Sequence, residues 1–238
     1  VLTGIHTGHY GSEFEDYSFS DLLKDILTIK ELKRLRISSI EITELDDEFL
    51  DILKNNKVLV DHMHIPLQSG SDKILKLMNR KYDKKYFIDK IEEIRKIRPL
   101  ISITTDVIVG FPGETEELFN ETLETVRKIR FSKIHVFPYS PREGTKSTLM
   151  DGQVDEVTKK RRVKTLIELS KELEIEYMDK FIGKELKFIP EVERDGYLFG
   201  HTGNYLYIKT KGCKELLHQS VTVKIENTNY PYSIGEII

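Results

Sequence analysis

Five loops rich in glycine, serine and proline follow five strand-like segments, and they hold the residues best suited to bind a ligand. The loops are His6–Gly11, Ser38–Glu44, Gln68–Asp72, Gly110–Thr115 and Tyr139–Thr145. Small residues in such loops expose backbone amides at helix starts, which favours a polar or anionic ligand. Any one loop could be an ordinary turn, but five similar loops at one end of a sheet indicate a ligand site.

Other groups with catalytic potential are few. The segment Gly110–Gly113 lacks both the dinucleotide-binding glycine pattern and the Lys-Ser/Thr of a Walker loop, which disfavours a dehydrogenase or an NTPase. His62 and His64 share one face of a strand, and such a pair is more often packed inward than bound to a metal. The acidic candidates for a barrel enzyme acting on a phosphorylated metabolite are Glu41, Glu44, Asp106 and Glu114. The helix dipole explains Glu114 without catalysis.

Strands alternate with helices from the first residue to about residue 182. The predicted strands are Val1–Ile5, Arg34–Ser39, His62–Leu67, Ser102–Gly110 and Lys133–Tyr139. Helices are expected to begin near Ser20, Asp46, Asp83 and Glu114, where capping or acidic side chains favour a helix start. The alternation predicts a parallel sheet of β/α units, arranged as an incomplete β/α barrel or, as the alternative, a doubly wound sheet.

A long helix and a small β domain complete the chain. Apolar residues from Val163 to Tyr177, Ile167 among them, recur at helical spacing and predict a helix over residues 155–181 that ends at Gly183. The predicted strands beyond it are Glu185–Val192, Tyr197–Thr202, Tyr205–Thr210, Ser220–Ile225 and a tail ending at Ile238. Five short strands suggest a small antiparallel barrel. The fold class is therefore α/β: a partial β/α barrel over residues 1–183, then a β-barrel over residues 184–238.

Composition excludes several classes of protein. No apolar run approaches the roughly 18–20 residues of a membrane-spanning helix, and no export signal opens the chain. A net charge of −3 disfavours a generic polyanion binder. Cys213 is the sole cysteine, so the chain has no intrachain disulfide and no cysteine-only metal site. A reducing, cytoplasmic location is the simplest interpretation.

Two groups of residues could contact RNA. The first opens the long helix and is either a solvated face or a set of phosphate contacts. Its members are Lys159, Lys160, Arg161 and Arg162. The second lies in the C-terminal barrel, where aromatic and basic side chains on adjacent strands could stack bases. Its members are Tyr197, Tyr205, Lys209 and Lys211.

Taken in order, the loops resemble those of the MiaB-like methylthiotransferases, radical S-adenosylmethionine (SAM) enzymes that thiomethylate RNA or a ribosomal protein. The matching segments are Val1–Gly11, Arg36–Glu41, His64–Asp72, Leu77–Arg80, Thr105–Thr115 and Phe137–Thr145. The C-terminal barrel resembles the RNA-binding TRAM domain of that family. The Leu-Thr-Gly start and the Ser-Ser-Ile-Glu segment are most similar to the branch that acts on threonylcarbamoyladenosine beside the tRNA anticodon. The alternatives are an isopentenyladenosine or ribosomal-protein substrate, or a non-enzymatic RNA-binding module.

This resemblance implies SAM bound across the barrel rim and two [4Fe-4S] clusters, one of them held by a CxxxCxxC triad. It implies the tRNA anticodon stem-loop and an electron donor such as flavodoxin or ferredoxin as partners. All six cluster cysteines are absent from these 238 residues, and the chain starts at Val1 rather than Met. We therefore expect a part of a longer protein, able to hold ligands and unable to react alone.

The resemblance also suggests which residues hold the two polar ends of SAM. Gly4, Ser38 and Ser39 would contact its amino and carboxylate groups. Arg80 would pair with the carboxylate, since a guanidinium matches carboxylate geometry. No catalytic side chain and no metal ligand is assigned.

The remaining predicted contacts involve the nucleoside end of SAM. Gln68 and Ser69 would form hydrogen bonds with the ribose. Gly110, Phe111 and the backbone of Tyr139 would border the adenine. These residues come from three different loops, so the prediction requires the third, fourth and fifth strands to end close together.

Overall fold

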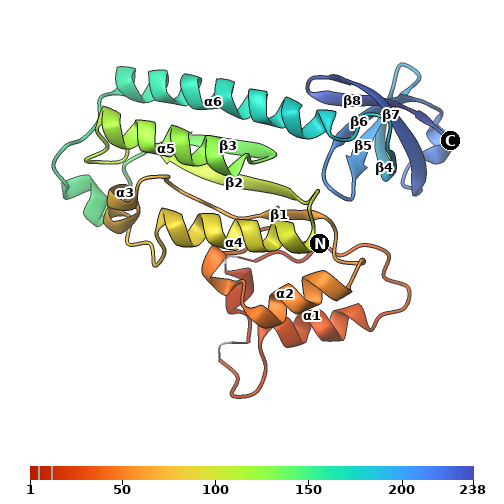
Figure 1. The fold of residues 1–238 in the computed structure, drawn as a ribbon, viewed down its shortest axis with the longest axis horizontal. Coiled ribbons are helices and arrows are strands. Elements are labelled where there is room, and N and C mark those ends of the chain that lie inside the picture. The colour runs from red at the N-terminus through yellow and green to blue at the C-terminus, as the bar shows by residue number, and fades with distance from the viewer. Residues whose placement is uncertain (5, 12) are drawn as a thin grey trace.

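The computed structural model describes residues 1–4, 6–11 and 13–238, and it joins an α/β part to a small β-barrel (Figure 1). The helices are α1 Phe19–Leu27, α2 Asp47–Asn55, α3 Asp72–Leu77, α4 Lys84–Ile97, α5 Glu116–Ile129 and α6 Glu156–Asp179. The strands of the α/β part are β1 His62–His64, β2 Ser102–Val109 and β3 Lys133–Pro138. Those of the barrel are β4 Glu185–Arg194, β5 Tyr197–Thr202, β6 Tyr207–Lys211, β7 Val221–Asn229 and β8 Tyr232–Ile237.

The sheet of the α/β part is parallel, in the order β1-β2-β3. The two predicted strands before it, at residues 1–5 and 34–39, are extended segments joined by single bridges rather than by ladders, and Ile5 lies outside the described residues. The bridges are Leu2–Ile37 and Leu35–Leu59. Neighbouring segments thus follow chain order, which is the order of a β/α barrel and differs from a doubly wound sheet.

The predicted helices begin at capping side chains. Asp46, Asp83 and Asp155 each accept a hydrogen bond from the backbone N–H three residues later, at 2.7–2.9 Å. Such a bond satisfies one of the amides left free at a helix start. Helix α1 begins at Phe19, capped by Ser18, slightly before the predicted Ser20. The six-residue α3 is too short to have produced a periodic signal.

The side chains of strand β2 point alternately to the two faces of the sheet. Ile103, Val107 and Val109 are fully buried in the cluster that the helices form over one side of the sheet. The alternate residues, among them Thr104 and Asp106, point to the opposite side because side chains alternate along a strand. The core of the α/β part therefore lies between the sheet and its helices. The polar side chains of β2 point to the opposite face of the sheet, which is the inner face of the partial β/α barrel.

The β-barrel is closed, with strand order β4-β5-β6-β8-β7. Its predicted antiparallel pairing is wrong at one position, since β6 and β8 run parallel through Ile208–Ser233 and Lys209–Ile234. A closed ring of five strands cannot alternate direction at every neighbour, so one parallel pair is unavoidable. The predicted C-terminal tail is a complete strand, β8, which pairs with β7 as a hairpin.

Helix α6 connects the two parts and contributes to both cores (Figure 1). Its predicted apolar face is confirmed for Leu166 and Leu173 but is wrong for Ile167, which is half exposed. The helix ends at Asp179, and Gly183 does not cap it. Gly183 has φ +81° and donates its N–H to the Ile225 carbonyl at 2.8 Å, which turns the chain into β4. The buried hydrophobic residues form two separate clusters, and the second includes Tyr177, Met178 and Phe181 from the end of α6 and just beyond it. The division at residue 183 stays a prediction.

Replacing Tyr177 by Phe should lower the free energy of unfolding by about 1–3 kcal/mol, because buried polar partners lose a hydrogen bond. The Tyr177 hydroxyl donates to the Leu100 carbonyl at 2.9 Å and accepts from Asn204 Nδ2 at 3.1 Å, so it joins α6, the loop before β2 and the β-barrel. Urea unfolding measures the change, with the exposed Tyr10→Phe as control. Equal stability of both variants would contradict this role.

Candidate functional site

A cavity of about 430 Å³ lies at the carboxyl ends of β2 and β3. Its lining includes Gln68, Asp106, Ile108, Phe111, Tyr139 and Arg142. The rings of Phe111 and Tyr139 meet edge to face with centroids 5.2 Å apart, which gives the cavity an aromatic wall. Gln68, Phe111 and Tyr139, predicted from separate loops, therefore lie together. A cavity of this size with an apolar wall and a few polar groups is typical of a small-molecule site.

The loop after β2 is held by its own glutamate. Gly110 has φ +74°, and its N–H donates to Glu114 Oε2 at 2.6 Å. A side chain at Gly110 would be strained by this φ and would also overlap the stem of Lys159. The loop therefore requires glycine here for two independent reasons.

Helix α6 fixes the same loop through a buried ion pair. Arg162 Nη1 lies 2.8 Å from Glu114 Oε2 and also donates to the Glu114 carbonyl at 3.0 Å. Both side chains are almost completely buried. Burial raises the pKa of the Glu114 carboxyl, whereas the Gly110 N–H and Arg162 act in the opposite direction. The pair positions Gly110 and Phe111 beside the cavity.

The predicted basic run of α6 does not form one surface. Lys159 and Arg162 are buried, so the prediction that they contact RNA is wrong. The reason is their spacing of three residues, which puts both on the face of α6 that packs against the loops. Lys159 donates to the Tyr139 carbonyl at 3.2 Å. Lys160 and Arg161 are exposed, and Arg161 forms a two-pronged pair with Glu116.

Ser69 does not reach the cavity, which corrects its predicted contact with the ribose. It is fully buried, and its Oγ lies 3.4 Å from Thr122 Oγ1 on α5. The reason is the close approach of the loop to the helix at Gly70, whose N–H donates to Thr122 Oγ1 at 3.1 Å. Gln68, with φ +65°, remains at the cavity.

The residues predicted to hold the polar ends of SAM lie outside this cavity. Gly4, Ser38 and Ser39 lie on the two extended segments beyond β1, where the Ser38 N–H donates to the Leu2 carbonyl. Arg80 Nη1 lies 3.0 Å from Glu41 Oε1, so its guanidinium already has a carboxylate partner. Their contacts with SAM stay predictions.

A groove of about 710 Å³ on the β-barrel gathers three of the predicted RNA contacts. Tyr197, Lys209 and Lys211 line it, and Lys209 Nζ lies 4.5 Å from the centre of the Tyr197 ring. Two asparagines, Asn227 and Asn229, contribute neutral hydrogen-bonding groups. Glu226 and Glu236 also line the groove, so its two lysines are matched by two carboxylates. An aromatic ring beside a lysine is a way of binding a base and its phosphate, and the contact with RNA stays a prediction.

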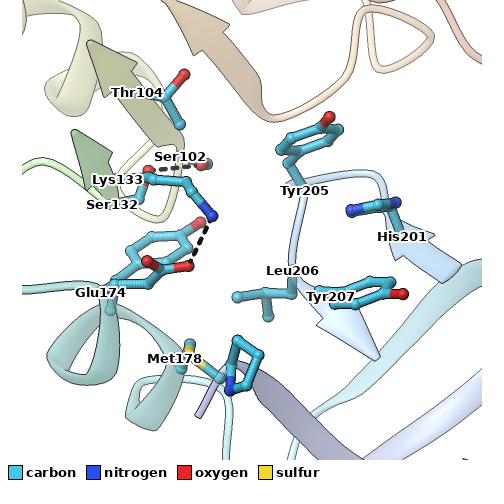
Figure 2. A pocket seen from close by; sticks show the side chains of 12 residues that line it. Ser102, Thr104, Ser132, Lys133, Glu174, Met178, His201, Tyr205, Leu206 and Tyr207 are labelled. Atoms are coloured by element: carbon cyan, nitrogen blue, oxygen red, sulfur yellow. Dashed lines mark hydrogen bonds and ion pairs between the residues drawn. The ribbon is translucent and has the colours of Figure 1, made fainter. Parts of the chain in front are cut away.

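Tyr205 does not line this groove, and its predicted contact with RNA stays a prediction. Its ring stacks on His201 at 4.6 Å, approaches His62 at 4.6 Å and lies under Arg36 at 4.5 Å. The reason is that Tyr205 sits in the turn between β5 and β6, which faces the α/β part. Figure 2 shows Tyr205, His201 and Tyr207 on one side of a cavity of about 100 Å³ at this junction.

No sequence pattern indicated this junction. Arg36, His62 and His201 come from three distant segments, and only the packing of the barrel against the sheet brings them together. Burial lowers the pKa of His62 to about 3, with a further contribution from the Arg36 charge, so the ring is neutral at pH 7. His62 and His64 lie on one face of β1, and both rings contact Thr104 Oγ1.

Part of the sequence matches the model of a known protein family. Residues 6–126 match the radical SAM superfamily. The chain belongs to the radical SAM superfamily. A solved structure of coproporphyrinogen III oxidase from Escherichia coli, a radical SAM enzyme, covers 78% of this chain and 48% of its own with a TM-score of 0.51 at 15% identity. That similarity supports the fold alone.

Curated relatives of this radical SAM chain are tRNA-modifying enzymes. It is 44% identical to the threonylcarbamoyladenosine tRNA methylthiotransferase of Bacillus subtilis, over 100% of this chain and 54% of the relative. It is 42% identical to the Thermotoga maritima protein of the same name, over 94% of this chain and 52% of that protein. The tRNA-2-methylthio-N(6)-dimethylallyladenosine synthase of Campylobacter jejuni subspecies doylei is 40% identical, over 100% and 56%. The chain spans about half the length of these relatives.

Membership of the superfamily implies that SAM and an iron–sulfur cluster are bound. The residues of this chain suit SAM but do not suit a cluster. The 430 Å³ cavity has room for a nucleoside-sized group, and the buried Tyr139 hydroxyl at its wall has no partner among the described residues. An iron–sulfur cluster needs several thiolates, and Cys213, exposed on the β-barrel, is the sole cysteine. Within the described residues, no helix is both long and apolar enough to cross a membrane.

Proposed function

We propose that this chain is the SAM- and tRNA-binding part of a methylthiotransferase that modifies carbon 2 of threonylcarbamoyladenosine next to the tRNA anticodon. The observation that carries the proposal is the 44% identity over the whole chain to a threonylcarbamoyladenosine tRNA methylthiotransferase. The partners proposed with it are the anticodon stem-loop and an electron donor such as flavodoxin or ferredoxin. The proposed location is the cytoplasm, where tRNA is modified.

In this proposal the 430 Å³ cavity binds the nucleoside of SAM. Phe111 and Tyr139 form a wall for the adenine, and Gln68 offers an amide to the ribose hydroxyls. When bound in an enzyme of this superfamily, SAM supplies the organic radical, and the protein contributes orientation and shielding. Two clusters are proposed for the whole enzyme, but none of their ligands is assigned to this chain, because it has one cysteine.

The decisive experiment is mass analysis of tRNA nucleosides after deletion of the gene in its own organism. We expect the methylthio form of threonylcarbamoyladenosine to disappear and the unmethylthiolated form to accumulate. Unchanged levels would overturn the proposed substrate. Loss of methylthio-dimethylallyladenosine instead would support the second candidate, which the 40% identity to the Campylobacter jejuni synthase favours. No change in any nucleoside would favour an RNA-binding module without catalysis.

Replacing Gln68 by Ala should weaken SAM binding by this chain about five- to tenfold, which corresponds to the loss of one hydrogen bond. Gln68 is half-buried at the cavity, so the change should leave the fold intact. Isothermal titration calorimetry with SAM measures the affinity. Gln219→Ala, at an exposed glutamine of the β-barrel, is the matched control. Unaltered affinity in the Gln68 variant would remove this residue from the SAM site.

Replacing Lys209 by Ala should weaken the binding of an anticodon stem-loop RNA. The slope of the logarithm of the binding constant against the logarithm of the salt concentration should become shallower by about one, because one counterion fewer is released. The ammonium group lies over Tyr197 in the barrel groove, where a phosphate beside a stacked base would meet it. Fluorescence anisotropy at several salt concentrations gives the slope. Lys57→Ala, in the α/β part, is the control. An identical slope in both variants would place the RNA elsewhere.

A further inference from the structure

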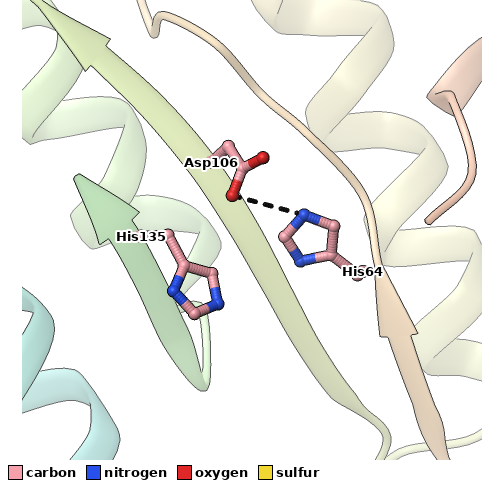
Figure 3. A group of neighbouring side chains, drawn as sticks. All are labelled: His64, Asp106 and His135. Carbon is pink, nitrogen blue, oxygen red and sulfur yellow. Dashed lines mark ion pairs between the residues drawn. The ribbon is translucent and has the colours of Figure 1, made fainter. Parts of the chain in front are cut away.

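Three side chains that can bind a metal converge on the inward face of the sheet (Figure 3). His64 lies on β1, Asp106 on β2 and His135 on β3. The parallel register pairs His64 with Thr104 and Asp106 with His135, and Thr104 and Asp106 are two residues apart, so all three side chains point to one side. Their ligand atoms all lie within 4.8 Å of one another.

We propose that His64, Asp106 and His135 form a binding site for a divalent transition-metal ion such as Zn²⁺ or Fe²⁺. Two imidazoles and one carboxylate are a donor set for such ions, whereas Ca²⁺ and Mg²⁺ prefer oxygen ligands. His64 Nε2 lies 3.3 Å from Asp106 Oδ1. Ligands bound at about 2.0–2.2 Å around a tetrahedral ion are separated by a similar distance. His135 completes the set from the exposed side, with its ring centroid 5.7 Å from that of His64.

A hydroxyl behind His64 holds the imidazole in the orientation that a ligand needs. Thr104 Oγ1 lies 2.9 Å from His64 Nδ1 and 3.2 Å from His62 Nε2. The hydroxyl can accept from the His64 Nδ1–H and donate to His62 Nε2. In this arrangement the Nε2 lone pair of His64 faces the Asp106 carboxylate. Both groups are acceptors and repel each other, and a cation bound between them would remove the repulsion. Metal-bound histidines commonly make such a second hydrogen bond.

The site borders the cavity proposed for SAM. Asp106 belongs to both, since it also lines the 430 Å³ cavity. Three protein ligands leave a coordination position open for water or a small ligand. The site requires neither tRNA nor a cysteine, so it does not depend on the proposed methylthiotransferase function.

The test is a metal titration of the untagged 238-residue chain after treatment with a chelator. Co²⁺ is the spectroscopic probe, because its visible bands report coordination by nitrogen and oxygen, and Zn²⁺ is measured by calorimetry. We expect one ion per chain, with affinity at least tenfold weaker in His64→Gln, Asp106→Asn and His135→Ala. His135 is exposed, so its removal should leave the urea transition unchanged. His218→Asn, at an exposed histidine of the β-barrel, and Cys213→Ser are matched controls that should bind as the parent chain does.

Two results would overturn the proposal. Binding of much less than one ion per chain would mean that these three side chains do not form a metal site. Full binding in both His135→Ala and Asp106→Asn would place the ion elsewhere on the chain. Either result would leave the proposed function intact, because the tRNA nucleoside analysis does not depend on this site.

Discussion

Replacing Arg162 by Met is expected to lower the free energy of unfolding by about 3–5 kcal/mol, the range found when one partner of a buried ion pair is removed. The Glu114 carboxylate would remain buried without its cation, and the Glu114 carbonyl would lose its donor as well. The carboxylate could then stay in place only by taking up a proton, which costs free energy at neutral pH. The loop holding Gly110 and Phe111 would loosen with it.

Urea unfolding tests this expectation against a close control. Arg161→Met removes the neighbouring guanidinium, which pairs with Glu116 at the surface, and should cost no more than about 1 kcal/mol. The double change Glu114→Gln with Arg162→Met should recover part of the loss, because no charge is then buried alone. Equal costs for Arg161 and Arg162 would mean that the buried pair does not hold the loop.

The α/β architecture could be predicted because local signals and packing agree along most of the chain. Capping residues such as Asp46 and Asp83 sit directly before apolar helical patterns, and each helix that was predicted starts within about two residues of the predicted point. The alternation of strand and helix then leaves few topologies. The parallel β6–β8 pair escaped prediction because it follows from closure of the whole ring rather than from any local pattern.

The sequence predicted which loop residues come together at the ends of the strands. It did not predict which residues are buried where helix α6 packs against those loops. Gln68, Phe111 and Tyr139 follow strand ends, and the rule that such ends meet located them correctly. Lys159 and Arg162 look like surface cations in the sequence, because a buried partner such as Glu114 is not visible along the chain. The His64–Asp106–His135 cluster depends on strand register, which periodicity alone does not define.

Replacing Gly70 by Ala is expected to cost about 2–4 kcal/mol of stability, through overpacking and the weakening of two hydrogen bonds. A Cβ at Gly70 would lie 2.7 Å from both Thr122 Cα and Thr125 Cβ of α5, closer than packed carbon atoms approach. The Gly70 N–H donates to Thr122 Oγ1 and the Gly70 carbonyl accepts from Thr125 Oγ1, so the added methyl would force apart the groups that join loop and helix. Gln68 lies two residues away on the same loop, so SAM affinity should fall along with stability.

The matched control for this change is Gly203→Ala in the β-barrel. A Cβ there would meet no atom within 4 Å, and the backbone of Gly203 is not in the left-handed region, so stability should change by less than about 0.5 kcal/mol. Urea unfolding and calorimetry with SAM compare the two variants. If Gly70→Ala lost stability but kept full SAM affinity, the position of Gln68 would not depend on the contact with α5. If it lost neither, the close packing of loop and helix would not constrain the site, and the cavity would owe its shape to the Glu114–Arg162 pair alone.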